Sequence, residues 1–362
     1  MNARRGRWLA ACALVCVGWF AAQTLLVGSS EADQAALLPL VHVALSADRA
    51  QWRAMLTCMN ATLSTAREPQ RVRFHALCGR DECGALQRYC TAAASAALCG
   101  AVEWTEFDTL AIERRFGRES TSSSAARNLS APHNFARFYL ADLLPLSVHK
   151  VVWLDNDVLA QRDVAELFDA ALPDASPFAL AAVVQRRPLD DSMVRRILLG
   201  LDGKPFGKAA APGDKRPRTL DMRHGSVVAP LLERVARCRD SAGAPVCFHF
   251  NAGVGVYRLD RWRALNVTAA IEEWLLFLAD NPAVAVGLTQ PPLVFHFWDN
   301  VEELDWKWNV GSAADLERMA DENDPKLAEA ALLHFNGDAK PWLSHNRRIA
   351  DMWNRHAPTI DP

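Results

Sequence analysis

The chain has 362 residues with a formal net charge of −2, and half of the residues are hydrophobic. This length is ample for a large buried core. So small a net charge gives no sign of the basic face that a nucleic-acid-binding protein carries. The composition therefore predicts a globular protein with no nucleic-acid partner.

The N-terminus has the pattern of a membrane signal anchor. Arg4, Arg5 and Arg7 precede an uncharged, mainly apolar run over residues 8–27, and about 20 residues is the length that crosses a bilayer as a helix. A cleaved signal peptide, the alternative, has a shorter apolar region and a small-x-small exit, which the segment 20–22 fits poorly. Since the positive-inside rule keeps arginines in the cytoplasm, the sequence predicts a type II arrangement. Its parts are a cytoplasmic tail over residues 1–7, a transmembrane helix over 8–27, a short stem over 28–38 and a lumenal domain beyond.

Glycosylation sequons begin at three asparagines of the predicted lumenal part, Asn60, Asn128 and Asn266. Each would accept a glycan only where it is exposed in the secretory pathway. Asn60 falls within a predicted packed helix, which makes it the weakest of the three. The sequons agree with a lumenal location.

The cysteines also fit an oxidising compartment, which permits disulfides. Nine occur in the chain, and the seven beyond the predicted anchor are Cys58, Cys78, Cys83, Cys90, Cys99, Cys238 and Cys247. An odd number leaves at least one of them unpaired within the chain. A Cys238–Cys247 bridge would close a short loop, and the four cysteines between residues 78 and 99 could form two more. The sequence alone does not determine the connectivity.

From residue 41 onward, apolar runs with the spacing of strands and of helices alternate. The first predicted strands cover residues 41–46, 72–77 and 102–107, and the predicted helices that follow the first two cover 51–63 and 85–97. This alternation predicts a mostly parallel sheet covered by helices. Later segments are predicted as a helix over 134–144, an amphipathic turn over 163–168, a strand over 178–184, a basic insertion over 186–245 that shapes a cleft, and a helix over 261–279.

The most informative stretch is Lys-Val-Val-Trp-Leu-Asp-Asn-Asp over residues 150–157. Its apolar run reads as a buried strand that ends in two carboxylates, Asp155 and Asp157. Ligands gather beyond the carboxyl ends of strands in open α/β sheets. Carboxylates suit Mg²⁺, Mn²⁺ or Ca²⁺, and an ion held this way can bridge to a diphosphate. An isolated Asp-x-Asp is usually a solvated turn or a helix cap, so this interpretation depends on the strand before it and the motifs after it.

Two downstream motifs support a ligand site. Asn251-Ala252-Gly253 interrupts a strand-like pattern over residues 248–259, and glycine within a strand often marks a bulge or the close approach of another molecule. His334 follows an apolar pair, as buried structural histidines commonly do, but Gly337 and Lys340 come three and six residues later. Imidazole can complete a metal shell, glycine lets the backbone approach a phosphate, and lysine supplies a compact positive charge. The combination predicts a site that binds a diphosphate.

Together these segments resemble glycosyltransferase family 8, the retaining enzymes of the GT-A fold. The matching blocks are residues 134–145, 151–158, 250–256 and 334–342, with support from 290–293 and 308–310. The resemblance implies a GT-A catalytic domain over residues 39–345, built as a mixed, mostly parallel α/β sheet flanked by helices, and a C-terminal tail over 346–362. It implies Mn²⁺-dependent transfer, with Mg²⁺ as the alternative, of a hexosyl, pentosyl or uronosyl unit from a UDP-sugar to a glycan or glycoconjugate acceptor. The implied location is the Golgi membrane, with the endoplasmic reticulum as the alternative.

The same resemblance assigns roles to individual residues. The implied metal ligands are Asp155, Asp157 and His334, and the implied catalytic residues are Gln290, under the reacting face of the sugar, and Asn251. The implied donor contacts are Ala47, Asp48, Arg137, Asn156, Ala252, Gly253, Gly337 and Lys340. The chain departs from the family at Ala50, where an Asp or Asn is common.

The predicted mechanism is transfer with retention by attack on the same face of the sugar. A double displacement needs a good nucleophile, and Gln290 is a neutral amide. The departing phosphate oxygen would then take the acceptor's proton. Two alternatives stay open: a catalytically inactive binding protein on the same scaffold, against which the intact metal and lysine set argues, and a UDP-sugar hydrolase.

Overall fold

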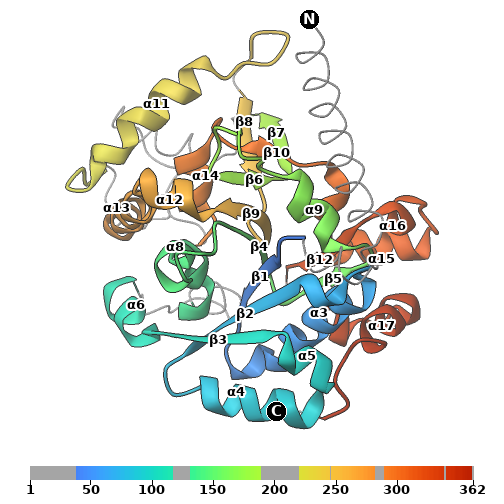
Figure 1. Cartoon of the computed structure of the whole chain (residues 1–362). Helices are drawn as coiled ribbons and strands as arrows, with labels where there is room; N and C mark the ends of the chain where they lie inside the picture. Colours follow the sequence, from blue (N-terminus) through green and yellow to red (C-terminus); the bar gives the residue numbers. More distant parts are fainter. Residues whose placement is uncertain are drawn as a thin grey trace, which may run out of the picture. The chain divides into compact units, whose positions relative to one another are not determined.

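The structure is a computed structural model, and it describes residues 38–116, 131–188, 220–244, 246–281, 289–337 and 340–360. Residues 41 onward form one compact unit (Figure 1). Within the described ranges, no helix has both the length and the apolar character needed to span a bilayer. The predicted tail and anchor over residues 1–27 and the sequon at Asn128 lie outside the described residues.

Strands and helices alternate along the first half of the unit. The strands are β1 Val41–Ser46, β2 Val72–Gly79, β3 Val102–Phe107, β4 Lys150–Leu154, β5 Val158–Ala160, β6 Leu180–Ala182, β7 Val184–Pro188, β8 Val246–Phe250, β9 Val254–Arg258, β10 Glu302–Glu303, β11 Val310–Ser312 and β12 Leu332–Asn336. The α-helices are α3 Trp52–Thr65, α4 Cys83–Ala93, α5 Ala96–Gly100, α6 Thr109–Phe116, α8 Leu140–Leu143, α9 Val164–Ala170, α11 Val228–Arg237, α12 Leu259–Ala264, α13 Val267–Asp280, α14 Pro291–Phe297, α15 Ala313–Asp321, α16 Lys326–Glu329 and α17 Arg347–Asn354. The 3-10 helices are η1 Arg49–Gln51, η2 Pro69–Arg71, η3 Pro132–Phe138, η5 Gly225–Val227, η6 Trp306–Trp308 and η7 Pro341–Leu343.

In the described part of the chain, the main sheet has seven strands in the order β10-β6-β9-β4-β1-β2-β3. Strands β4, β1, β2 and β3 run parallel to their neighbours in this series, whereas β9 is antiparallel to both β4 and β6. The predicted mixed, mostly parallel sheet is confirmed. Strands β1 and β4 lie in the middle of the sheet (Figure 1), and their carboxyl ends therefore open at the same edge.

Both faces of the sheet are buried, which explains the continuous apolar run of β4. Val152 and Leu154 belong to one hydrophobic cluster, together with residues of α3 and α9. Val151 and Trp153 belong to the other, together with residues of α13 and α14. Because successive side chains of a strand point to opposite faces, a strand that is covered on both sides is apolar at every position.

A small second sheet brings the C-terminal part of the chain to the end of β4. It has the order β11-β12-β5. Strand β12 pairs antiparallel with β5, with His334 opposite Val158, and the Phe335 amide donates to the Asp157 carbonyl at 3.0 Å. This register places His334 beside the residue that precedes β5.

Several predicted elements differ from the structure. The strands predicted over 41–46 and 102–107 are confirmed to the residue. The helix predicted over 134–144 is wrong: η3 begins at Pro132 and is followed only by the short α8. Its apolar residues are nevertheless buried, which gave the helical spacing. The helix predicted over 261–279 is two helices, because Asn266 adopts a left-handed conformation with φ of 52° between α12 and α13. Helix α11 lies within the stretch predicted as a basic insertion.

Two disulfides join the cysteines between residues 78 and 99, as the sequence allowed. They are Cys78–Cys83 and Cys90–Cys99. The possible Cys238–Cys247 bridge is not formed, and Cys238 is a free, buried thiol. Cys58 is also a buried thiol, and burial, followed by the charge of Asp157, raises the pKa of that thiol.

The sequons differ in what they offer to a glycan. The side-chain nitrogen of Asn60 donates to the His356 carbonyl at 3.0 Å, and Thr62 is fully buried. A glycan on Asn60 would displace this contact. Asn266 is exposed in the turn before α13. Of the two sequons in the described part of the chain, Asn266 is the accessible one.

A histidine pair between β1 and β2 gives a prediction for stability against pH. The His42 Nδ1 and His75 Nε2 atoms lie 2.9 Å apart. Burial lowers the pKa of both imidazoles to about 4, helped at His42 by the charge of His75 and at His75 by that of Arg73. Both rings are therefore neutral in the folded protein, whereas the unfolded chain takes up protons near pH 6.5.

We expect the free energy of unfolding to fall as the pH drops from about 6.5 to about 4, by on the order of 3 kcal/mol after allowance for the partial exposure of His42. Urea unfolding at pH 7 and pH 4.5 measures this difference. His75→Gln should reduce it, and His149→Gln at an exposed histidine should not. An equal pH dependence in both variants would remove the pair as its origin.

Candidate active site

The two carboxylates lie where the buried strand β4 ends and the chain turns into β5. The Asp155 amide donates to the Gly253 carbonyl at 2.7 Å, and the Val158 amide donates to the Asp155 carbonyl at 3.1 Å. These bonds fix Asp155 against the start of β9 and close a tight turn through Asp157. Both acids are therefore placed by backbone hydrogen bonds at the edge where β1 and β4 end.

The structure brings the three predicted metal ligands together. Asp155, Asp157 and His334 each offer one ligand atom, and these atoms all lie within 4.8 Å of one another. The His334 Nε2 atom is 4.0 Å from Asp155 Oδ2 and 3.4 Å from Asp157 Oδ1. Residues separated by about half the chain thus converge because β12 pairs with β5.

In each carboxylate, one oxygen is held by the chain and the other faces His334. Asp155 Oδ1 accepts from the Arg137 guanidinium at 2.9 Å and from the Trp153 indole at 2.8 Å. Asp157 Oδ2 accepts from the Lys340 ammonium at 2.5 Å. Burial alone would raise the pKa of Asp157, but the His334 and Lys340 side chains outweigh burial and lower it. Asp157 is therefore ionised, and both carboxylates are oriented toward the gap beside His334.

The space between the ligands fits a hard divalent cation. Two carboxylates and one imidazole are a suitable donor set for Mn²⁺ or Mg²⁺. A Cβ built on Gly253 would lie 2.1 Å from His334 Cε1 and 2.7 Å from Asp155 Oδ2. Only glycine leaves this gap open, so the absence of a side chain at residue 253 is part of the site.

The predicted contacts to the nucleotide lie at the end of β1. Ala47 is fully buried, and Asp48 begins the turn into η1. Asn156 donates through Nδ2 to the Ser46 carbonyl at 2.8 Å and to the Gln51 side chain at 2.9 Å. The buried oxygens Asp48 Oδ1 and Asn156 Oδ1 have no hydrogen-bond partner among the described residues. Two acceptors are thus left for donors of a ligand.

The predicted sugar-facing residues form a connected group. Arg137 is buried, donates to the Ala252 carbonyl at 2.8 Å and lies 4.9 Å from the Trp153 ring centroid. The Ala252 amide donates to the Gln290 side chain at 3.2 Å, and the Gly253 amide donates to the Asn251 side chain at 2.8 Å. Gln290 is therefore placed against the segment between β8 and β9, and the Asn251 side chain shapes that segment.

Gly337 and Lys340 follow β12. Gly337 has a φ of +106°, which few residues other than glycine adopt without strain. Lys340 donates to the Phe335 carbonyl at 3.2 Å as well as to Asp157. The predicted diphosphate lysine is thus paired with the carboxylate of a predicted metal ligand, which places its positive charge at the site.

Sequence reasoning missed two residues that hold the ligands. Trp153 was read as an apolar strand residue, although its indole nitrogen donates to Asp155. The Asn309 Oδ1 atom lies 2.9 Å from His334 Nδ1. No local pattern could reveal the second contact, because it depends on the pairing of β11 with β12.

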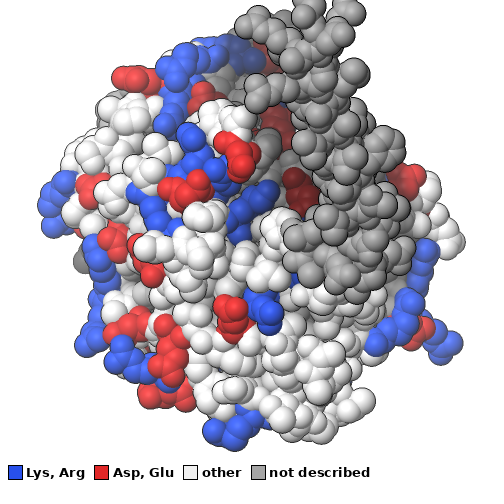
Figure 2. All heavy atoms as spheres, viewed as in Figure 1, with Lys and Arg blue, Asp and Glu red and all other residues white. Residues whose placement is uncertain are grey.

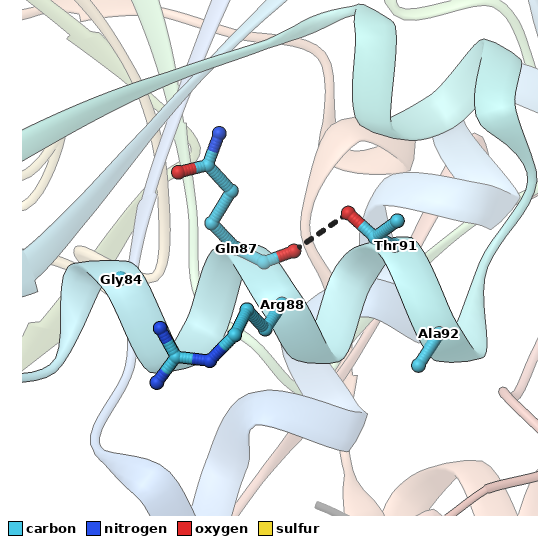
Figure 3. Close-up of a pocket in the computed structure, with 5 residues that line it drawn as sticks. All are labelled: Gly84, Gln87, Arg88, Thr91 and Ala92. Atoms are coloured by element: carbon cyan, nitrogen blue, oxygen red, sulfur yellow. Dashed lines mark hydrogen bonds between the residues drawn. The ribbon is translucent and has the colours of Figure 1, made fainter.

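Two features of the described surface, its charge on one face and a depression along α4, give no sign of a second site. On the face seen in Figure 2, basic and acidic side chains are interspersed, without a broad patch of one sign. An open depression lies along α4 (Figure 3), lined by Gly84, Gln87, Arg88, Thr91 and Ala92. All of these residues come from one helix, and the Thr91 hydroxyl donates to the Gln87 carbonyl at 3.0 Å. The depression therefore lacks converging polar groups from several elements.

Comparison with known families and proteins gives a consistent assignment. A family model described as glycosyl transferase family 8 matches residues 42–346. A protein of Arabidopsis thaliana named probable galacturonosyltransferase-like 3 is 25% identical over 311 residues, which cover 85% of this chain and 76% of that protein. The glycosyltransferase 8 domain-containing protein 1 of Mus musculus is 27% identical over 257 residues, or 69% of this chain, and the match spans 60% of its length.

Solved structures share the fold at low identity. The galactosyltransferase LgtC, in complex with donor and acceptor sugar analogues, has a TM-score of 0.56 at 17% identity, covering 89% of this chain and 98% of that one. The glycosyltransferase GlyE of Streptococcus pneumoniae has a TM-score of 0.50 at 15% identity, covering 90% of this chain and 61% of that one. The likeness establishes a GT-A-like α/β fold.

Proposed function

We propose that this chain, which belongs to glycosyl transferase family 8, transfers a sugar from a UDP-sugar to a glycan or glycoconjugate with retention, using Mn²⁺ or, as the alternative, Mg²⁺. The observation that carries the proposal is the convergence of Asp155, Asp157 and His334 within 4.8 Å. Membership of this glycosyltransferase family, together with this donor set at the carboxyl end of a central strand, supports the function of a nucleotide-sugar transferase.

The proposed chemistry is stabilisation of the leaving group. A divalent ion at this site would offset the negative charge that builds on the departing diphosphate. Lys340 supplies a second positive charge beside Asp157, and the positive φ of Gly337 lets the backbone approach a phosphate closely. Arg137, buried against Trp153, holds Asp155 and the Ala252 carbonyl in place.

Gln290 is proposed to orient the donor sugar instead of attacking it. Its side-chain oxygen accepts from the Ala252 amide, and a neutral amide is a poor nucleophile. We expect Gln290→Ala to lower kcat by about tenfold or more, with a smaller change in KM for the donor, because loss of orientation affects the reacting geometry. Gln87→Ala on the remote helix α4 is the matched control. Full kcat in Gln290→Ala would remove this residue from the site.

The decisive test is release of UDP from a panel of UDP-sugars by the purified protein. The panel contains UDP-galactose, UDP-glucose, UDP-xylose and UDP-galacturonate, with Mn²⁺, with Mg²⁺ and with EDTA. Metal-dependent release that a glycan acceptor accelerates supports a transferase. Release that is independent of every acceptor supports the hydrolase, and binding of UDP without release supports the inactive binding protein.

The proposed location is the Golgi membrane, with the endoplasmic reticulum as the alternative, in the type II orientation given by an anchor over residues 8–27. The exposed sequon at Asn266 provides a test. In cells that express the full chain, Asn266→Gln should abolish one glycosidase-sensitive shift in gel mobility. No shift at any sequon, together with cytoplasmic staining, would contradict the lumenal orientation.

A further inference from the structure

Asn309 connects two parts of the site through one side chain. It lies between η6 and β11, and it is half-buried. Its Nδ2 atom donates to the Asn251 carbonyl at 3.1 Å, and its Oδ1 atom lies 2.9 Å from His334 Nδ1. One amide thus spans a metal ligand and the sugar-facing segment.

The donor and acceptor roles of the Asn309 amide determine which ring nitrogen of His334 carries a proton. The Asn251 carbonyl can only accept, so the NH₂ group of Asn309 must face it. The amide oxygen of Asn309 must then face His334, and an oxygen of this kind can only accept from the ring. The Nδ1 atom of His334 therefore carries a proton, which leaves Nε2, the nitrogen on the side of Asp155 and Asp157, as the one that can bind a cation.

The backbone on both sides of Asn309 is held, so the amide is not carried by a free loop. Val310 pairs with Leu333 in the register of β11 and β12. On the other side, the Ala331 amide donates to the Lys307 carbonyl at 2.8 Å, and Trp308 is buried. The amide is thus fixed relative to the strand that carries His334.

We propose that Asn309 is the positioning residue of the metal site: it locks His334 in the Nδ1–H form and couples the ring to the Asn251–Gly253 segment. The inference rests on the proposed function, because it assumes that His334 binds a cation. A partner on the other nitrogen of a metal-binding histidine fixes its tautomer and orientation, and loss of such a partner commonly weakens metal binding by about 10–100-fold.

The test measures Mn²⁺ binding to the full-length protein, solubilised in detergent and without donor, by the EPR signal of free Mn²⁺. Asn309→Ala should weaken binding by about 10–100-fold. The exposed Asn354→Ala, in α17, is the matched control. In the His334→Ala background, Asn309→Ala should add no further loss, because the residue acts through the ring.

A measurement on the unaltered protein covers the case in which Asn309→Ala does not fold. The ¹⁵N spectrum of the histidine side chains, assigned with His334→Gln, should show a proton on Nδ1 of His334 in metal-free protein. A ring without a proton on Nδ1 would overturn the inference, as would parental Mn²⁺ affinity in Asn309→Ala. If the parent protein itself binds no Mn²⁺ and releases no UDP, the proposed function fails. This result differs from the outcomes that overturn the role of Asn309, because those are seen in a parent protein that binds Mn²⁺ or in the proton position of its His334.

Discussion

Asp157→Ala should abolish release of UDP, with a loss in kcat of about a thousandfold or more. Asp157 is buried, offers Oδ1 to the gap shared with His334, and holds the Lys340 ammonium through Oδ2. Its removal therefore deletes one metal ligand and releases the lysine that we assign to the diphosphate. No other carboxylate in the described part of the chain lies in the ligand cluster except Asp155.

Two variants separate the loss of a ligand from a loss of fold. Asp157→Asn preserves the shape but removes the charge, and it should bind Mn²⁺ weakly and turn over slowly. Asp351→Ala, at an exposed position of α17, is the matched control and should be fully active. Thermal unfolding in EDTA reports whether each variant is folded. A folded Asp157→Ala protein that releases UDP at the parental rate would show that this residue holds no metal.

Gly253→Ala should weaken cation binding and lower kcat while the fold is retained. The added Cβ would lie 2.1 Å from His334 Cε1, 2.6 Å from His334 Nε2 and 2.7 Å from Asp155 Oδ2. Neither neighbour can give way freely, since the Gly253 carbonyl accepts from the Asp155 amide at 2.7 Å and His334 lies in β12. We expect Mn²⁺ binding to weaken more than about tenfold and kcat to fall about a hundredfold, because displaced ligands cost both affinity and geometry.

Gly255→Ala is the matched control for this effect. It lies two residues further along β9, where a Cβ would meet Tyr257 Cε2 at 3.2 Å and the Ala181 carbonyl at 3.4 Å. The tighter packing should lower the melting temperature without changing Mn²⁺ affinity. If the two variants lost affinity equally, the gap at Gly253 would not be specific to the cation.

The apolar periodicity of the sequence was sufficient to predict several strands and helices whose apolar faces are buried. β1 and β3 were predicted to the residue: β1 is an apolar, buried run, and β3 alternates apolar Val102 and Trp104 with polar Glu103 and Thr105. The helix predicted over residues 134–144 was wrong because buried Phe135, Phe138 and Leu140 reproduce helical spacing across a 3-10 helix and the start of the short α8. Spacing reports which side chains are buried, and several backbone conformations can bury the same set.

The ligand set itself followed from motifs, since each of Asp155, Asp157 and His334 has a recognisable local context. The residues that contact and orient these side chains did not follow from motifs. Trp153 was read only as apolar, and Asn309 meets His334 through strand pairing that no local segment encodes. Residues that orient a ligand act through atoms that look ordinary in sequence, so long-range register is needed to find them.

The placement of Arg137 and Lys340 also bears on the order of assembly. Two acids so close together would repel each other in a bare site, but a guanidinium lies against one of them and an ammonium against the other. Repulsion is offset by cations that belong to the polypeptide, so folding does not wait for an external ion. Under the proposed function, the chain folds first and takes up its divalent cation afterwards.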